Sequence, residues 1–185
     1  GDTKVVGKGK CDRIFINTSG TGVFLREEPD VRTASAVKPG DRLIVNGSLG
    51  NHSIAVLGSR NNLSFTTPVI SDCASLNHLT AKLLIECNGI HFMRDLTRGG
   101  LAGVLNELSS MCRRGIIIEE TFLPVDEPVR GACEMLGFDP LYLANEGKLL
   151  IVAERNEALK VLDILRSDPL GSNAAVIGEI ASVEK

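Results

Sequence analysis

The stretch MRDLTRGGLAGVLNELS, residues 93–109, combines a strand end with a helix start and therefore decides the fold. The run GIHFMRD at 89–95 has the length and apolar content of a strand. Four apolar residues after the glycine pair follow the i, i+3, i+4, i+7 spacing of one helical face: Leu101, Val104, Leu105 and Leu108. We expect a strand that ends at Asp95, a tight turn, and a helix that begins near Gly99.

Short apolar runs alternate with helical patterns on both sides of this stretch. Strands are expected over five further ranges: 12–18, 42–47, 115–120, 148–153 and 174–180. A short helix should follow the turn at 47–53. Longer helices should begin at Asp72 and at Pro128, and a third, capped by Asn156, should run to Arg166. Gly137 is expected to end the helix that begins at Pro128. This order predicts an α+β fold, with helices packed on a mixed β-sheet.

A turn with a central proline and glycine, VKPGD at 37–41, follows a segment without clear periodicity at 26–36. We therefore place a domain boundary close to Val37, and expect residues 37–185 to form one α+β domain. Gly1 lies inside a motif, so we expect residues 1–36 to be the end of a preceding domain.

Composition excludes several classes of function. The net charge of −3 over 185 residues comes without the clustered basic face that nucleic-acid binding requires. The apolar runs are too short to cross a bilayer. The cysteines lack a CxxC or a metal-ligand spacing, which is typical of reduced thiols in a cytoplasmic protein. They are Cys11, Cys73, Cys87, Cys112 and Cys133.

The turn from Asp95 to Gly100 has the composition of an anion site. A helix N-terminus presents backbone N–H groups and the positive end of the helix dipole, and glycines admit a close approach of phosphate. Arg98 is suited to phosphate oxygens and Asp95 to a Mg²⁺ ion that bridges them. The alternative is structural: Thr97 caps the helix and the glycines permit a tight turn. The residues alone leave both interpretations open.

Three further turns carry acids or bases. Asp2 is a candidate metal ligand and Lys4 a candidate phosphate contact, although, when this turn is taken alone, a structural turn with a solvated lysine is the favoured explanation. His52 in GSLGNHS is a candidate phosphate donor or proton-transfer group, or a structural hydrogen-bonding residue. Glu146 in ANEGK is a candidate Mg²⁺ ligand or general base, or an exposed turn residue. The occurrence of these turns together favours a functional site more strongly than any single turn does.

Six segments also match one family in order. They are GDTKVV at 1–6, LGNHS at 49–53, SDCASLN at 71–77, MRDLTRGGLAGVLNE at 93–107, LPVDEPVRGACEMLGFDPLYLANEGKLL at 123–150 and DPLGSNAAVIGEI at 168–180. Together they resemble the HypE family of hydrogenase maturation factors, in the superfamily of aminoimidazole ribonucleotide synthetase and selenophosphate synthetase. PVRGACE with GFDPLYLANEGKLL is the most specific pairing. The resemblance implies the fold of the synthetase's C-terminal domain.

The resemblance implies a cytoplasmic, homodimeric carbamoyl dehydratase that uses ATP and Mg²⁺. In this family the carbamoyltransferase HypF loads a carbamoyl group onto a C-terminal cysteine, where it becomes a thiocyanate. The HypC–HypD scaffold complex accepts the resulting cyanide for the [NiFe] centre. ATP would activate the amide oxygen as a phosphate ester, and a base would complete the elimination.

Carried over residue by residue, the resemblance assigns a site. The nucleotide-binding set is Asp2, Lys4, Asp95, Thr97, Arg98, Gly99 and Gly100. The metal candidates are Asp2, Asp95 and Glu146, and the catalytic candidates are Glu146 and Lys4. Two departures stand out, because Asn51 replaces an aspartate and Leu96 a proline. The family's first domain would lie almost wholly before Gly1, with residues 1–36 as the last motif and strand of this truncated ATP-binding domain. Its cysteine tail would follow Lys185, so turnover by this chain alone is expected to be negligible.

Two competing interpretations remain open. One is another ATP-dependent synthetase of the superfamily, such as a selenophosphate synthetase. The other is a non-catalytic module that docks a maturation partner, an interpretation that Asn51 supports. The nucleotide-binding residues would then be vestigial.

Overall fold

The computed structural model describes residue 21 and residues 30–61 and 67–184, which contain one five-stranded sheet. The strands are β1 (Arg42–Val45), β2 (Ile90–Asp95), β3 (Arg114–Ile118), β4 (Leu149–Ala153) and β5 (Ala175–Glu184). The helices are α1 (Asn51–Asn61), α2 (Asn77–Glu86), α3 (Gly100–Cys112), α4 (Glu127–Leu136) and α5 (Ala158–Arg166). Short 3-10 turns lie at Glu120–Phe122, Pro140–Tyr142 and Pro169–Gly171.

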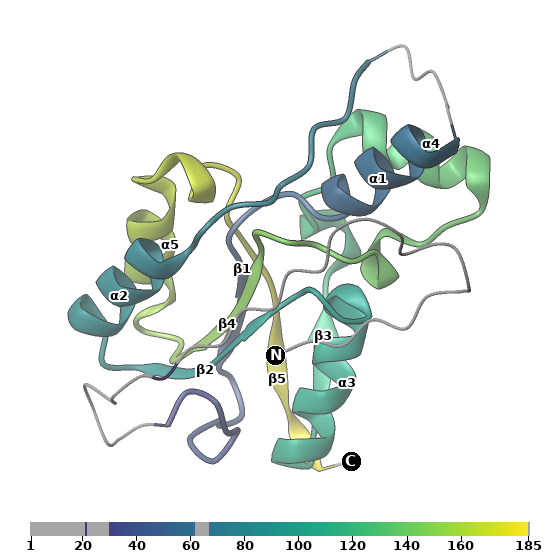
Figure 1. Ribbon diagram of the computed structural model, residues 1–185. Coiled ribbons are helices and arrows are strands. Elements are labelled where there is room, and N and C mark those ends of the chain that lie inside the picture. Colours follow the sequence, from purple (N-terminus) through teal and green to yellow (C-terminus); the bar gives the residue numbers. More distant parts are fainter. Residues whose placement is uncertain (1–20, 22–29, 62–66, 185) are drawn as a thin grey trace.

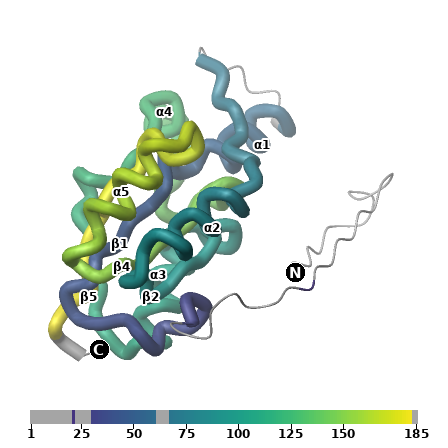
Figure 2. The backbone as a smooth tube through the Cα atoms, turned by 90° about the vertical axis from the view of Figure 1, so that its left-hand side faces the viewer, coloured from purple at the N-terminus to yellow at the C-terminus, as the bar shows by residue number. Residues whose placement is uncertain are grey.

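Helices cover both faces of the sheet, with α3 on one side and α2 and α5 on the other (Figure 1). Side chains alternate along each strand, so in β1 Leu43 and Val45 join the cluster that contains α3, whereas Ile44 joins the cluster that contains α2 and α5. Figure 2 looks onto the face covered by α2 and α5. Helices α1 and α4 pack on each other through Ile54 and Val129 in a third, smaller cluster.

The strand order is β2-β4-β1-β5-β3, and every pairing among the described strands is antiparallel. This confirms the α+β class but corrects the expected mixed sheet. The first three strands of the chain run in one direction, and β4 and β5 lie between them in the other. Periodicity identifies a strand but carries no information about its neighbours, and so the late insertion of β4 and β5 was not predicted.

Most expected boundaries are confirmed. Strand β2 ends at Asp95 and α3 begins at Gly100, while α4 starts after Asp126 and is terminated by Gly137 in the left-handed conformation (φ 72°). Two expected caps are wrong, because Leu76 precedes α2 and Glu157 precedes α5. Leu76 occupies the N-cap position expected for Asp72, and Glu157 occupies the one expected for Asn156. The strand expected at 12–18 lies outside the described residues.

The described cysteines carry no disulfide: Cys73, Cys87, Cys112 and Cys133 are all free thiols. Burial raises the pKa of the Cys133 thiol, because the thiolate would lose its hydration, and the nearby Asp139 adds to this. Across the described part of the chain, no helix combines the length and apolar character needed to cross a membrane.

Candidate functional site

Three of the candidate turns meet at one edge of the sheet because of its strand order. Strand β4 lies between β1 and β2 and runs antiparallel to both, with Leu150 opposite Val45 and Leu149 opposite Asp95. The start of β4 therefore lies beside the ends of β1 and β2. The turns that follow β1 and β2 are brought next to the ANEGK turn that precedes β4.

Backbone hydrogen bonds join the Asp95–Gly100 turn directly to the ANEGK turn. The Leu96 N–H donates to the Lys148 carbonyl at 3.1 Å, and the Asn145 N–H donates to the Leu96 carbonyl at 3.2 Å. The Leu96 side chain is fully buried in the cluster around α3. The proline that the family resemblance places here has no N–H and could not donate to the Lys148 carbonyl, whereas Leu96 can.

The N-terminus of α3 has no side-chain cap, which excludes Thr97 as the capping residue. Gly99 occupies the N-cap position with φ 66°, and Gly100 has φ 61°. A Cβ atom on Gly100 would lie 2.5 Å from the Leu141 carbonyl oxygen, so only glycine fits this close approach. The glycines thus have a structural role. At the same time, the uncapped N–H groups of α3 begin a few residues after the exposed Asp95 and fit a phosphate group.

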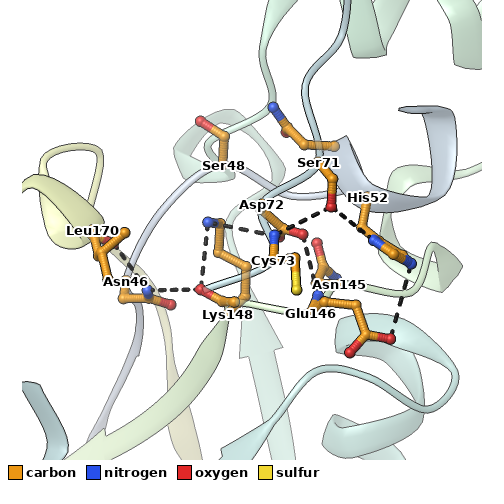
Figure 3. A network of polar contacts seen from close by, with 12 residues as sticks. Asn46, Ser48, His52, Ser71, Asp72, Cys73, Asn145, Glu146, Lys148 and Leu170 are labelled. Atoms are coloured by element: carbon orange, nitrogen blue, oxygen red, sulfur yellow. Dashed lines mark hydrogen bonds and ion pairs between the residues drawn. The ribbon is translucent and has the colours of Figure 1, made fainter. Parts of the chain in front are cut away.

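Glu146 lies in the adjoining turn with its side chain 28% exposed (Figure 3). Its carboxylate Oε1 lies 3.9 Å from His52 Nε2, and its backbone N–H donates to Asp72 Oδ1 at 3.1 Å. His52 Nδ1 in turn lies 2.9 Å from Ser71 Oγ. The structure therefore brings together His52 and Glu146, which the sequence nominated separately, and adds Ser71 and Asp72.

The metal assignment receives no support from the described side chains. Among residues 30–61 and 67–184, no group of three or more His, Cys, Asp and Glu side chains is placed to hold a metal ion. The Glu146 carboxylate lies beside the His52 imidazole, a pairing that is compatible with a proton acceptor. Asp2 and Lys4 lie outside the described residues.

A polar pocket of about 250 Å³ opens next to this edge, and none of the candidate catalytic, nucleotide-binding or metal-binding residues lines it. Its lining includes the polar side chains of Asn46, Ser48, Asn51, Asp72, Asp126 and Lys148. Asn46 is fully buried and donates to the carbonyls of Gly147 (3.2 Å) and Leu170 (3.0 Å). Asn46 lies inside the strand expected at 42–47, so no local signal in the sequence pointed to this role.

The departure at Asn51 has a structural counterpart in this pocket. The Asn51 amide donates to Asp126 Oδ2 at 2.8 Å, and the Ser48 hydroxyl donates to Asp126 Oδ1 at 2.6 Å. An aspartate at position 51 would place two carboxylates together and remove one of these donors. In this chain the amide therefore satisfies Asp126.

Asp168 anchors the turn on the far side of the pocket. The Leu170 backbone N–H donates to Asp168 Oδ1 at 2.8 Å, and this bond is the main reason that the pKa of the carboxyl lies below its usual range. His78 Nε2, 2.9 Å from Asp168 Oδ2, lowers the pKa further. The Leu170 carbonyl is one of the two acceptors of Asn46.

The antiparallel sheet, its two helical layers and the glycine turns at one edge define a domain of the AIR synthase type. Residues 38–185 match the family described as AIR synthase related protein, C-terminal domain, and the chain belongs to that family. Over 180 residues it is 49% identical to the carbamoyl dehydratase HypE of Rhodobacter capsulatus, covering 96% of this chain and 52% of the relative. The resemblance drawn from the motifs is confirmed.

Solved structures agree with this assignment. A crystal structure of a HypE–HypF complex is similar with a TM-score of 0.77 and 47% identity, over 80% of this chain and 48% of the other. A crystal structure of HypE in complex with ATP gives a TM-score of 0.79 and 44% identity, over 82% of this chain and 45% of the other. The chain spans about half the length of the relatives it matches.

Proposed function

We propose that this chain supplies the C-terminal-domain half of an ATP-dependent carbamoyl dehydratase that acts in [NiFe] hydrogenase maturation. The observation that carries the proposal is the hydrogen-bonded junction of two turns at one sheet edge. It places the uncapped N-terminus of α3 beside the turn that holds Glu146. Residues 37–185 would form this domain and residues 1–36 the end of an ATP-binding domain.

The phosphate-binding role falls to the Asp95–Gly100 turn. The α3 N–H groups and Arg98 would bind phosphate oxygens, with Gly99 and Gly100 permitting the approach and Thr97 beside them. Asp95 is exposed and would hold Mg²⁺ together with Asp2. Lys4 would contact a phosphate group. ATP, when bound, supplies the phosphoryl group that makes the amide oxygen of a carbamoyl group a good leaving group.

Glu146 would accept a proton from the amide nitrogen as the carbon–oxygen bond breaks and the nitrile forms. Its side chain is partly exposed and reaches solvent at the junction, and His52 lies against one carboxylate oxygen. A partly exposed carboxylate beside an imidazole is suited to accept a proton from a substrate that arrives from outside the domain. We assign Glu146 as the general base and not as a metal ligand.

The partners follow from the relatives. HypE has been crystallised with HypF and with ATP, so we propose a HypF carbamoyltransferase as the donor of the carbamoyl group to this protein and ATP as its nucleotide. A HypC–HypD scaffold as cyanide acceptor, Mg²⁺, a homodimer and a cytoplasmic location complete the proposal.

A chimera tests the proposal. The matching 180 residues of the Rhodobacter capsulatus relative are replaced by this chain, and conversion of the carbamoylated cysteine to thiocyanate is followed by mass spectrometry. We expect ATP-dependent turnover that falls about 100-fold or more in Glu146→Gln. The matched control is Glu134→Gln, on the exposed face of α4. Turnover without ATP, or an active Glu146→Gln chimera, would overturn the proposal.

Nucleotide binding is tested on this chain alone by calorimetric titration with Mg²⁺ and a non-hydrolysable ATP analogue. We expect Asp95→Ala to lower the affinity, because it removes the proposed metal contact. Asp163→Ala, an exposed acid on α5, is the control and should leave the affinity unchanged. An equal effect of the two substitutions would contradict the role of Asp95.

A further inference from the structure

The segment Ser71–Cys73 lies directly on the turn that carries Glu146, although the two are more than 70 residues apart in the chain (Figure 3). A Cβ atom on Gly147 would lie 2.0 Å from the Asp72 carbonyl oxygen and 3.1 Å from the Ala74 nitrogen. The contact between the segment and the turn is therefore backbone against backbone. We call residues 71–73 the crossing segment.

The crossing segment fixes the backbone of Glu146 through Asp72. The Asp72 side chain is only 4% exposed, and its Oδ1 accepts the Glu146 N–H at 3.1 Å. Its Oδ2 lies 3.6 Å from Lys148 Nζ. One buried carboxylate thus contacts the residues on both sides of Gly147, which defines the direction in which the Glu146 side chain leaves the turn.

Ser71 acts on the other end of Glu146, through His52. The Ser71 hydroxyl oxygen accepts the Cys73 N–H at 3.2 Å and lies 2.9 Å from His52 Nδ1, to which it can donate its own proton. An imidazole that accepts at Nδ1 carries its proton at Nε2 when neutral. The Nε2–H group is the one that faces Glu146 Oε1, at 3.9 Å.

We propose that the crossing segment is a positioning element for Glu146: Asp72 sets its backbone, and Ser71 selects the His52 tautomer that presents an N–H group to its carboxylate. This inference rests on the proposed function only in taking Glu146 as the base. Ser71, Asp72 and His52 touch Glu146 or one another, and act through it rather than on the substrate.

The tautomer is measured by ¹⁵N NMR of the histidine side chains in this chain, at about pH 8, where imidazole is neutral. We expect His52 to be mainly Nε2–H. Ser71→Ala should lower the ratio of the Nε2–H to the Nδ1–H form about fivefold, which corresponds to a hydrogen bond of about 1 kcal/mol. Ser71→Thr keeps the hydroxyl and should keep the ratio. Cys73→Ala keeps the backbone N–H and is the matched control.

A predominant Nδ1–H form in the wild-type chain, or an equal change in Cys73→Ala and Ser71→Ala, would overturn the tautomer assignment. The orientation of Glu146 is read from its side-chain ¹³C carboxyl resonance, which should move in Asp72→Asn and Ser71→Ala but not in Cys73→Ala. A resonance unchanged in all three variants would overturn the positioning role.

These spectra require neither ATP nor turnover, so they separate this inference from the proposed function. In the chimera, Ser71→Ala should lower kcat about tenfold and leave KM unchanged, because it disturbs the base and not nucleotide binding. An unchanged kcat beside an altered tautomer ratio would overturn the positioning role. An inactive wild-type chimera with the expected spectra would overturn the function instead.

Discussion

The layers that cover the sheet and the edge that carries the candidate site are built from different interactions. The layers consist of aliphatic and aromatic side chains, many with no exposed surface, packed in clusters on the two faces. The edge consists of polar atoms that join distant parts of the chain, as when Asn46 binds Gly147, 101 residues away. The layers determine whether the domain folds, while the edge determines the position of Glu146.

The layers and the edge also differ in how their interactions stabilise the fold. Apolar burial is non-directional and scales with area, so it tolerates small displacements of the packed groups. A buried amide such as Asn145 instead satisfies particular backbone atoms, here the Gly50 N–H at 2.8 Å and the Leu143 carbonyl at 2.9 Å. Losing such a partner leaves a buried group unsatisfied at one place. Substitutions in the two regions should therefore differ in what they disturb as well as in size.

The largest effect is expected for Phe92→Ala in the layer formed with α3. Phe92 is fully buried, and its truncation should lower the free energy of unfolding by about 3–5 kcal/mol. Urea unfolding followed by circular dichroism measures this. Phe122→Ala removes the same side chain at a position that is 60% exposed and should cost far less. Equal losses at the two positions would contradict the distinction between layer and surface.

Asn46→Ala is expected to come next. The substitution removes three hydrogen bonds to backbone groups: those to the carbonyls of Gly147 and Leu170, and the one from the Leu149 N–H to Asn46 Oδ1 at 2.7 Å. Of these groups, the Gly147 carbonyl also accepts from Lys148 Nζ at 3.4 Å. We expect a loss of about 2–3 kcal/mol in the same unfolding measurement. Asn173→Ala removes an exposed amide of the same pocket and should change stability by less than about 0.5 kcal/mol. A loss at Asn46 no larger than the loss at Asn173 would contradict the role of the buried amide.

Much of the layered fold could be predicted from the sequence, because its signals are local. The spacing of Leu101, Val104 and Leu108 gave α3, and Pro128 with Gly137 gave the ends of α4. The antiparallel pairing could not be predicted, since it depends on which strands become neighbours. Of the two wrong caps, Asp72 makes tertiary contacts with Glu146 and Lys148 in place of a helix cap, which no local signal shows.

The candidate site could be predicted only in part. Asp95, Glu146 and His52 stand in recognisable turns, but nothing local shows that the turns meet. Asp72 was expected to cap a helix, and its carboxylate instead reaches a turn 74 residues away. Asn46 has no motif of its own. Such residues are defined by partners that only the folded chain supplies.

A smaller effect is expected for Gly147→Ala, which tests the contact between the crossing segment and the Glu146 turn. The added methyl group would lie 2.0 Å from the Asp72 carbonyl oxygen, so residues 71–74 must move away. Overpacking of this kind should cost about 1–2 kcal/mol. Gly131→Ala, where a Cβ meets nothing within 4 Å, is the control and should be neutral or stabilising within α4. In Gly147→Ala the His52 tautomer ratio should also change, and an unchanged ratio would show that the turn and the segment are not coupled.

The smallest effect concerns the turn behind the pocket and appears only at acid pH. The pKa of the Asp168 carboxyl is lowered in the folded chain, chiefly by the Leu170 N–H, so the folded state favours the ionised form. The resulting stabilisation is fully present above the unfolded pKa of about 4 and is lost as the pH falls through the lower folded value. Asp168→Asn should therefore unfold with a shallower dependence of stability on pH below about 4 than the wild type. Because the Asp168 side chain is near the surface, salt should weaken its electrostatic interaction with His78 but not its hydrogen bond from the Leu170 N–H. The difference in pH dependence between Asp168→Asn and the wild type should therefore persist at high ionic strength. Parallel pH profiles of the two proteins in urea titrations would show that Asp168 does not anchor this turn, and would confine the polar control of the edge to Asn46 and the crossing segment.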